Sequence, residues 1–157
     1  MADVADLFIP FRFKVSLFLG DSNEPLCEGA FSEASGFEAT MAPKTVKEGG
    51  SNWGEVQLAG TTTFAPVVLK RGVTGVTDLW TWFDVVTRQA NYALRYTARI
   101  EVLSPESNSA EAVLIWTLAN AMPTRFKGPD LSGTATQVAV EELTLVHEGL
   151  SLERAAR

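Results

Sequence analysis

Alternation of apolar and polar residues, which is typical of strands with one buried face, is the commonest pattern along this chain. It runs from position 11 to 19 with apolar side chains at the odd positions, and from 92 to 102 with apolar side chains at the even positions. Short apolar runs between 26 and 42 are broken by glycine and favour two short strands or one bent strand. These segments predict a protein rich in β-structure.

Three later segments predict strands with less regular patterns. Positions 61–70 are rich in threonine and valine, and Pro66, which cannot donate a ladder hydrogen bond, favours a sheet edge or a bulge there. Positions 112–118 are apolar on both faces, which is typical of a strand covered on two sides, and a neighbouring subunit could supply one cover. A segment punctuated by proline and glycine, 120–133, leads to a last strand whose apolar parity changes at glutamates 141 and 142, and this change predicts a β-bulge.

A helical period occurs in one segment of the sequence. Thr77 and Asp78 can cap a helix, and apolar residues then recur at spacings of three and four. These apolar residues are Leu79, Trp80, Phe83 and Val86. The pattern predicts a helix over 77–89. Together with about seven expected strands it predicts a mainly β fold, an antiparallel sandwich or barrel with one α-helix attached.

The segment from Ala42 to Gly60 fits neither period. It contains Gly49, Gly50 and an aromatic residue, Trp53, without a clear buried face. Segments of this length without regular structure are uncommon in compact domains and are usually functional. We therefore expect a single domain over 1–157 with a projecting loop or hairpin at about 42–60, and we expect this projection to make a contact outside the monomer.

The composition narrows the classes of function. With 46% hydrophobic and 20% charged residues, the chain resembles folded globular proteins rather than disordered ones. Its formal net charge of -6 argues against tight nucleic-acid binding, because that affinity depends on clustered lysine and arginine. No apolar stretch approaches the roughly 20 residues of a membrane-spanning helix, so no membrane insertion is expected. The acidic N-terminal segment lacks the features of a secretory signal, which favours synthesis in the cytoplasm.

The sequence offers little for catalysis. Cys27 is the only cysteine and His147 the only histidine, so an intrachain disulfide and a Cys/His metal site are excluded. No glycine-rich phosphate loop and no nucleophile-elbow motif occurs. Glu141 and Glu142 are neighbours on a strand, point to opposite faces and cannot form a facing acid-base pair without a bulge. We therefore predict that the protein is not an enzyme and has no catalytic residue, no cofactor and no metal.

Two groups of side chains allow an alternative. The first could line an apolar pocket, which would make the protein a small ligand-binding β-barrel, although core packing is favoured at helical spacing. Its members are Trp80, Trp82, Phe83 and Trp116. The second group could form a basic patch, but the acidic residues around it favour a solvated or intersubunit face. Its members are Arg71, Arg95 and Arg99, accompanied by Glu101, Glu111 and Glu141.

Eight short segments, taken in order, cover nearly the whole chain and carry a family resemblance. They read FRFKV from position 11, AFSEASGF from 30, KEGGSN from 47, LKRGVT from 69, DLWTW from 78, WTLANAMP from 116, KGPDL from 127 and EELTLVHEGL from 141. In this order and spacing they resemble the phage tail tube protein family, which includes the inner tube proteins of phage-derived contractile injection systems.

The resemblance implies a tail tube fold of two packed antiparallel sheets, sandwich-like or barrel-like, with one helix. It implies a structural subunit of the inner tube of a contractile tail or extracellular contractile injection system, in which hexameric rings stack around a central channel that passes cargo. The implied partners are further copies of this chain, a surrounding sheath protein, baseplate and tail-terminator proteins, and cargo in the lumen. The implied location is a phage tail or injection-system particle made in the bacterial cytoplasm. Two related roles stay open: a baseplate-proximal subunit that initiates the tube, and the tube protein of type VI secretion.

The resemblance also implies that the segment 42–60 reaches a neighbouring ring. The residues expected in this inter-ring contact are Lys47, Glu48, Gly49, Gly50, Ser51, Asn52 and Trp53. In the strand that is apolar on both faces, three residues are expected either in an intersubunit contact or in the core. They are Val113, Ile115 and Trp116.

Overall fold

The computed structural model describes residues 13–20, 22, 24–29, 31–50, 52–73, 77–90, 93–103, 111–134 and 138–154. Strands dominate this part of the chain, as the alternating pattern predicts. The elements are β1 (Phe13–Leu19), β2 (Pro25–Gly29), β3 (Glu33–Ser35), β4 (Ala39–Met41), β5 (Lys44–Val46), β6 (Val56–Leu58), β7 (Thr62–Phe64), β8 (Val67–Gly72), α1 (Asp78–Thr87), β9 (Tyr96–Leu103), β10 (Ala112–Lys127), β11 (Val140–Val146) and β12 (Gly149–Arg154).

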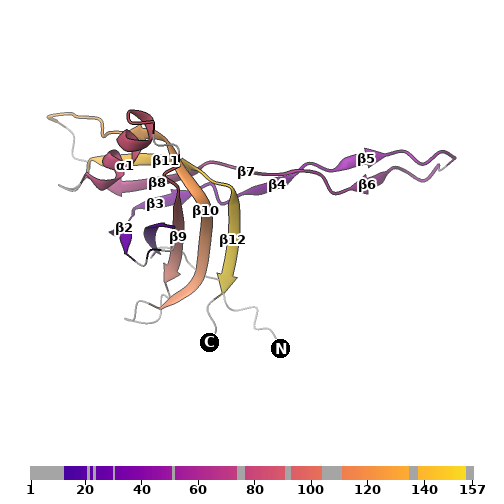
Figure 1. The fold of residues 1–157 in the computed structure, drawn as a ribbon, viewed down its shortest axis with the longest axis horizontal. Helices are drawn as coiled ribbons and strands as arrows, with labels where there is room; N and C mark the ends of the chain where they lie inside the picture. Colours follow the sequence, from indigo (N-terminus) through magenta and orange to yellow (C-terminus); the bar gives the residue numbers. More distant parts are fainter. Residues whose placement is uncertain are drawn as a thin grey trace.

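Two antiparallel sheets, joined by the long strand β10, form the body of the molecule (Figure 1). The first sheet has the order β2-β1-β9-β10-β12, and the second has the order β10-β11-β8-β3. The predicted mainly β fold with two antiparallel sheets and one helix is confirmed. The sheets do not close into a barrel, because the outer strands β2 and β3 end the path without pairing with each other in the described residues.

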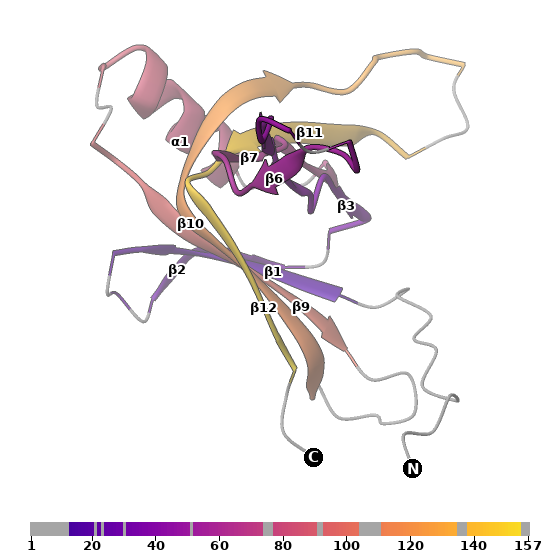
Figure 2. The same ribbon diagram turned by 90° about the vertical axis from the view of Figure 1, so that its right-hand side faces the viewer.

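A continuous two-stranded ribbon connects the sheets. β10 pairs with β12 from Leu114 opposite Arg154, and it keeps the same antiparallel register into β11, as far as Pro123 opposite Leu145. The ribbon bends at Asn120, which has a φ of 51° and donates a hydrogen bond of 2.9 Å from its side chain to the Glu148 carboxylate. Figure 2 shows β10 curving from one sheet into the other.

This ribbon corrects two predictions for the last third of the chain. The segment 120–133 does not simply lead to a last strand, because β10 continues through it to Lys127 with Pro123 buried within the strand. The expected β-bulge at glutamates 141 and 142 is also wrong, since β11 pairs with β8 without a register shift from Val140 to Leu145. The register shift lies instead on β10, between Pro123 and Arg125. A further strand, β12, was not expected.

The strand predicted over 61–70 is interrupted at Ala65 and Pro66, which separate β7 from β8. β8 is not at a sheet edge, as Pro66 suggested, because β11 and β3 flank it on both sides. Pro66 needs no ladder partner, since it lies in neither strand. The region 26–42 yields the short strands β2, β3 and β4.

The helix α1 packs against β10, the strand that both sheets share, and also contacts β2. The helix expected over 77–89 is present as Asp78–Thr87, but its buried face differs from the predicted one: Leu79 and Val86 are buried as expected, whereas Trp82 is buried in place of Trp80, which is exposed. The Thr77 side chain makes no capping hydrogen bond, contrary to prediction, and Asp78 accepts one of 2.8 Å from the Leu79 backbone N–H. Within the described residues, no helix has the length and apolar content to span a membrane.

The core is built from side chains that face inward from both sheets and the helix. It contains Val15, Leu17, Phe31, Val67, Leu69, Leu79, Trp82, Val86, Tyr96, Ala98, Ile100, Leu118, Ala121, Leu143 and Leu145. At its centre the rings of Trp82 and Tyr96 meet edge to face with centroids 4.7 Å apart. The core therefore joins the helix to the first sheet as well as to the second.

Candidate assembly surfaces

A two-stranded arm projects far from the body of the molecule (Figure 1). β4 pairs with β7 near the body, and β5 pairs with β6 further out, both antiparallel. The segment 42–60 forms the outer part of this arm. No residue of the arm strands belongs to the buried core cluster.

Most residues expected in an inter-ring contact lie around the tip of the arm. They are Lys47, Glu48, Gly49, Gly50, Asn52 and Trp53, whereas Ser51 lies outside the described residues. Trp53 is 98% exposed, and the Lys47 ammonium lies 3.8 Å from the Glu55 carboxylate across the arm. Gly50 and Gly54 have φ values of 88° and 135°, which glycine adopts readily. The tip therefore presents an indole ring and charges of both signs to the surroundings.

Close backbone contacts hold the arm at its root and midway along its length. A Cβ at Gly60 would lie 1.8 Å from the Ala42 carbonyl oxygen, and a Cβ at Gly36 would lie 2.1 Å from that of Pro66. The Ala42 N–H donates a hydrogen bond of 3.1 Å to the Thr61 carbonyl. These contacts leave no room for a side chain at either glycine and fix the direction in which the arm leaves the body.

The three residues singled out on β10 lie on both faces of the first sheet. Trp116 faces inward, since its cross-strand partner Ile100 is buried, and its ring stacks on Phe37 at 5.4 Å and 10°. Ile115 has the opposite parity and lies on the outer face, whereas Val113 lies at a register shift between β10 and β9; both are partly exposed. The chain thus covers the inner face of this strand and leaves its outer face to solvent or to a partner.

The strands at the ends of the first sheet offer unpaired backbone groups. In the described part of the chain, β12 pairs with β10 alone and β2 with β1 alone. On β12, Leu152 is 49% exposed. Such an edge is a template on which another chain can add a strand.

The arginine expected on a solvated or intersubunit face is buried instead. Arg71 on β8 makes bidentate hydrogen bonds of 3.3 and 2.7 Å to Asp78 at the start of α1. It also pairs with Glu141 on β11 and lies over the Phe31 ring at 5.6 Å. Sequence reasoning missed this group, because the three charges lie on different elements. The buried triad fastens the helix to the second sheet and offers no free group for chemistry.

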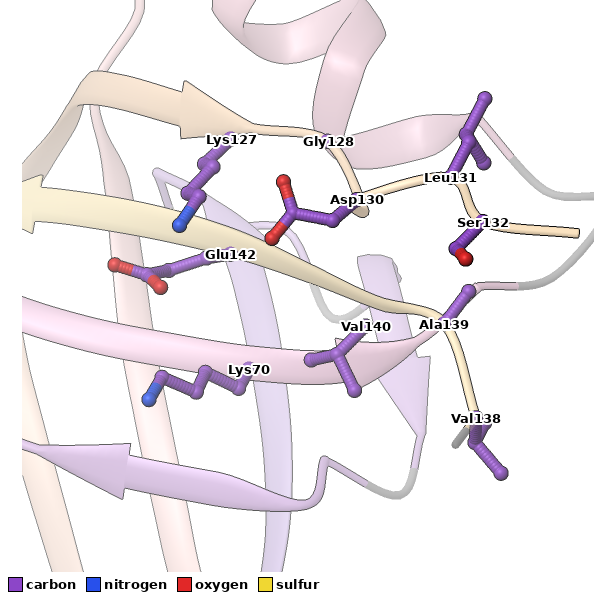
Figure 3. A pocket seen from close by; sticks show the side chains of 10 residues that line it. All are labelled: Lys70, Lys127, Gly128, Asp130, Leu131, Ser132, Val138, Ala139, Val140 and Glu142. Carbon is purple, nitrogen blue, oxygen red and sulfur yellow. The ribbon is translucent and has the colours of Figure 1, made fainter. Parts of the chain in front are cut away.

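An open hollow of about 510 Å³ lies on the outer face of the second sheet (Figure 3). Strands β8, β10 and β11 form its floor, and the loop that follows β10 forms one wall. Its lining residues are Lys70, Lys127, Gly128, Asp130, Leu131, Ser132, Val138, Ala139, Val140 and Glu142. The floor carries alternating charges, since Glu142 is the cross-strand partner of both Lys70 and Lys127. Leu131 is 89% exposed and Val138 is 80% exposed, so apolar side chains also border the hollow.

The aromatic residues considered for a ligand pocket do not come together around one cavity. Trp82 is buried in the core, whereas Trp80 contacts Phe83 and Phe126 at the surface. Trp116 lies on β10 in the first sheet and stacks on Phe37. Among the described residues, no group of three or more His, Cys, Asp or Glu side chains is placed to hold a metal ion. The features that the described residues do show are the arm, the unpaired sheet edges and the open hollow.

One protein family and several solved structures are similar to this chain. The family described as T4-like virus tail tube protein gp19 matches residues 9–151. A chain in the cryo-EM structure of the anti-feeding prophage (AFP) baseplate, 6-fold symmetrised, is 27% identical with a TM-score of 0.80, covering 94% of this chain and 96% of that chain. No curated protein matches significantly.

Two further structures show the same fold at lower identity. A chain in the PVC sheath-tube complex, an extracellular contractile injection system in the extended state, is 24% identical with a TM-score of 0.78, covering 97% of this chain and 95% of that chain. Hcp1 from Flavobacterium johnsoniae is 14% identical with a TM-score of 0.54, covering 90% and 95%.

Proposed function

Because this chain belongs to the T4-like virus tail tube protein family, we propose that it forms hexameric rings, which stack into the inner tube of a contractile tail or injection system. The family match over most of the chain carries this proposal. The central channel of the tube would pass cargo. The protein acts by assembly and catalyses no reaction, in keeping with a structural family.

The free sheet edges support ring closure. β12 and β2 bound the first sheet on opposite sides, so pairing an edge of one copy with an edge of the next extends the sheet around a ring. Closure removes the exposed edges that would otherwise favour aggregation. We assign Ile115, on the outer face of β10, and Val113, at the register shift beside it, to a contact with neighbouring copies, and Trp116 to the core.

The arm supports contact between rings. It extends well beyond the body, and Lys47, Glu48 and Trp53 at its tip are exposed. We assign the tip residues 47–53 to the contact with a neighbouring ring. The outer partners of the tube are a sheath, a baseplate and a tail terminator, in a particle assembled from proteins made in the bacterial cytoplasm.

Two related roles are the alternatives. The likeness to a chain of the AFP baseplate structure favours a subunit that initiates the tube at the baseplate. The likeness to Hcp1 concerns the fold alone and carries less weight for type VI secretion. Locating the subunit in micrographs of the assembled particle, along the tube or at its base, separates these roles.

Electron microscopy of the purified chain tests the proposal. Negatively stained samples are expected to show six-membered rings, and stacked rings at higher concentration. Leu152→Lys, which places a charge on the β12 edge, should reduce ring formation, because edge lysines oppose strand pairing. Thr87→Lys adds the same charge on the helix and serves as control. A protein that stays monomeric at high concentration would refute the proposal.

A further inference from the structure

The base of the arm meets the body through two aromatic rings. Phe64 ends β7 and pairs with Ala39 on β4, and it is the one residue of the four arm strands that is not exposed. Its ring lies 5.1 Å from the ring of His147, with an angle of 42° between the two planes. His147 lies between β11 and β12. This pair therefore joins the arm to the turn at which the chain passes from the second sheet to the first.

The same histidine contacts the strand that ends the first sheet. Its Nδ1 lies 3.0 Å from the carbonyl oxygen of Gly149, the first residue of β12. A carbonyl oxygen only accepts hydrogen bonds, so Nδ1 carries the proton and donates it. In the neutral ring, Nε2 is then left with a lone pair and no proton. One imidazole thus contacts both the arm and the β12 edge, to which the proposed function assigns different steps of assembly.

The Nε2 atom of His147 is withdrawn from solvent and has no hydrogen-bond partner in the part of the chain that the structure describes. The neutral ring leaves one acceptor unsatisfied there. A protonated ring would place a positively charged N–H at the same point, and an unpaired charged group costs more to bury than an unpaired neutral one. The position therefore favours the neutral ring over the cation.

Charged groups on the surrounding elements have partners of their own. Glu148 follows the histidine, and its carboxylate accepts a hydrogen bond of 2.9 Å from the Asn120 side chain and lies 4.0 Å from the Arg95 guanidinium. Glu38, at the base of the arm, accepts a hydrogen bond of 3.5 Å from the Thr40 hydroxyl. A protonated Nε2 would therefore find no acceptor among the described residues as they are arranged here.

We propose that His147 is a pH-sensitive latch, in which the neutral ring holds the base of the arm on the body and the protonated ring releases it. Histidine is the residue whose charge ordinarily changes between about pH 5 and about pH 8. The sign follows from the burial of Nε2, since the contact with Phe64 persists where the ring is neutral and is lost as the pH falls. The arm strands stay paired, so acid frees the direction of the arm. This latch goes beyond the proposed function, because it acts within one chain and requires no ring.

Hydrogen exchange measured by mass spectrometry tests the latch. The Ala65 N–H, next to Phe64, donates a hydrogen bond of 3.0 Å to the Glu38 carbonyl, so its protection reports whether the base of the arm is held. Rates are measured at about pH 7.5 and about pH 5.5 and divided by those of an unfolded peptide at the same pH. We expect the protection of the segment 62–65 to fall about fivefold or more in acid, and that of β9 to stay unchanged.

Two variants separate the histidine from its acidic neighbour. His147→Phe keeps an aromatic ring against Phe64 but cannot be protonated, so protection at the base of the arm should not depend on pH. Glu148→Gln removes the adjacent carboxylate, keeps an oxygen for the Asn120 hydrogen bond and should show the same fall as the wild type. Exchange of the imidazole C2 hydrogen reports the protonation of the chain's only histidine and should run parallel to the loss of protection.

Three results would overturn the latch. They are protection that does not depend on pH in the wild type, an equal fall in His147→Phe, and tighter protection in acid, which a cation–π contact with Phe64 would give. Thermal unfolding at both pH values shows whether a variant keeps its fold, and His147→Gln gives the same comparison if His147→Phe does not fold. Ring formation is measured separately, so absence of rings would refute the proposed function while exchange still decides the latch.

Discussion

Arg71 and Glu141 face each other as cross-strand partners on β8 and β11, and both Nε and Nη2 of the guanidinium lie within 2.7 Å of one carboxylate oxygen. The same arginine holds Asp78, so a single cation serves two carboxylates that are largely withdrawn from water. Because Asp78 begins α1, this arrangement ties the helix to two neighbouring strands at once.

Replacing the shared cation should be costly. Arg71→Met removes the cation that the largely buried carboxylates of Asp78 and Glu141 share, and we expect the free energy of unfolding to fall by about 3 to 5 kcal/mol. Urea denaturation measures the change. Lys70→Met is the control, because its ion pair with Glu33 is solvent-exposed and should contribute less than about 1 kcal/mol. Equal losses in the two variants would show that the triad has no special role.

Two tryptophans on the same helix should differ in their effect on stability. Trp82 is 2% exposed and packs on Tyr96, so Trp82→Ala should cost about 3 to 5 kcal/mol through lost burial and a residual cavity. Trp80 is 43% exposed, and Trp80→Ala should cost clearly less. Chemical denaturation compares both with the wild type. A larger loss for Trp80 would contradict the placement of the core on the Trp82 side.

Gly60, which lies midway along the arm between β6 and β7, should be irreplaceable. Gly60→Ala brings a methyl group into the Ala42 carbonyl, so the backbone must shift and the Ala42 to Thr61 hydrogen bond should weaken. Hydrogen exchange of the Ala42 amide is expected to accelerate. Gly49→Ala is the matched control, since a Cβ at Gly49 has no atom within 4 Å. Identical exchange in both variants would argue against a close contact between Gly60 and the Ala42 carbonyl.

Alkaline pH should destabilise the protein through Tyr96. Burial raises the pKa of its phenol above the ordinary 10.0, so above that pH the unfolded chain releases a proton that the folded chain keeps. The stabilising effect is complete below pH 10 and is lost as the pH rises through the folded-state pKa. Tyr96→Phe should therefore gain stability relative to the wild type as the pH rises above about 10, and should show no pH-dependent difference well below that value. A pH-independent difference between the two proteins would contradict this.

Local patterns predicted the elements whose environment lies within the monomer. The helix follows from apolar residues at spacings of three and four, although Trp82 rather than the expected Trp80 lies on its buried face, and the strands β1 and β9 follow from their alternation, because each has one face in the core. Pattern also identified 42–60 as unlike the rest of the chain. It left a loop and a hairpin as alternatives there and did not specify the strands β5 and β6, since a ribbon with no core beneath it buries too little to impose a strong period.

The errors lie where tertiary pairing overrides local signals. Pro123 predicts a loop by composition, yet it is buried within β10. The antiparallel register of β10 is unbroken from Leu114 to Pro123 and shifts immediately after it. The parity change near Glu141 reflected a charge directed inward, toward Arg71, rather than an extra residue. A buried arginine can turn a glutamate into an inward-facing residue, and no spacing rule in a single sequence reveals that partner.

The arm is paired entirely through residues close in sequence, β4 with β7 and β5 with β6, while close backbone contacts fix it at Gly36 near the body and at Gly60 between the two strand pairs. Its length can therefore change in evolution without any alteration of the core. Adding two residues to each strand would extend its reach by about 6.6 Å and keep the same side chains on the same face. Adding one residue to each would turn the side chains beyond it to the other side. Insertions in this segment should consequently accumulate in steps of two residues per strand, so that the length of the arm varies in increments of about 6.6 Å.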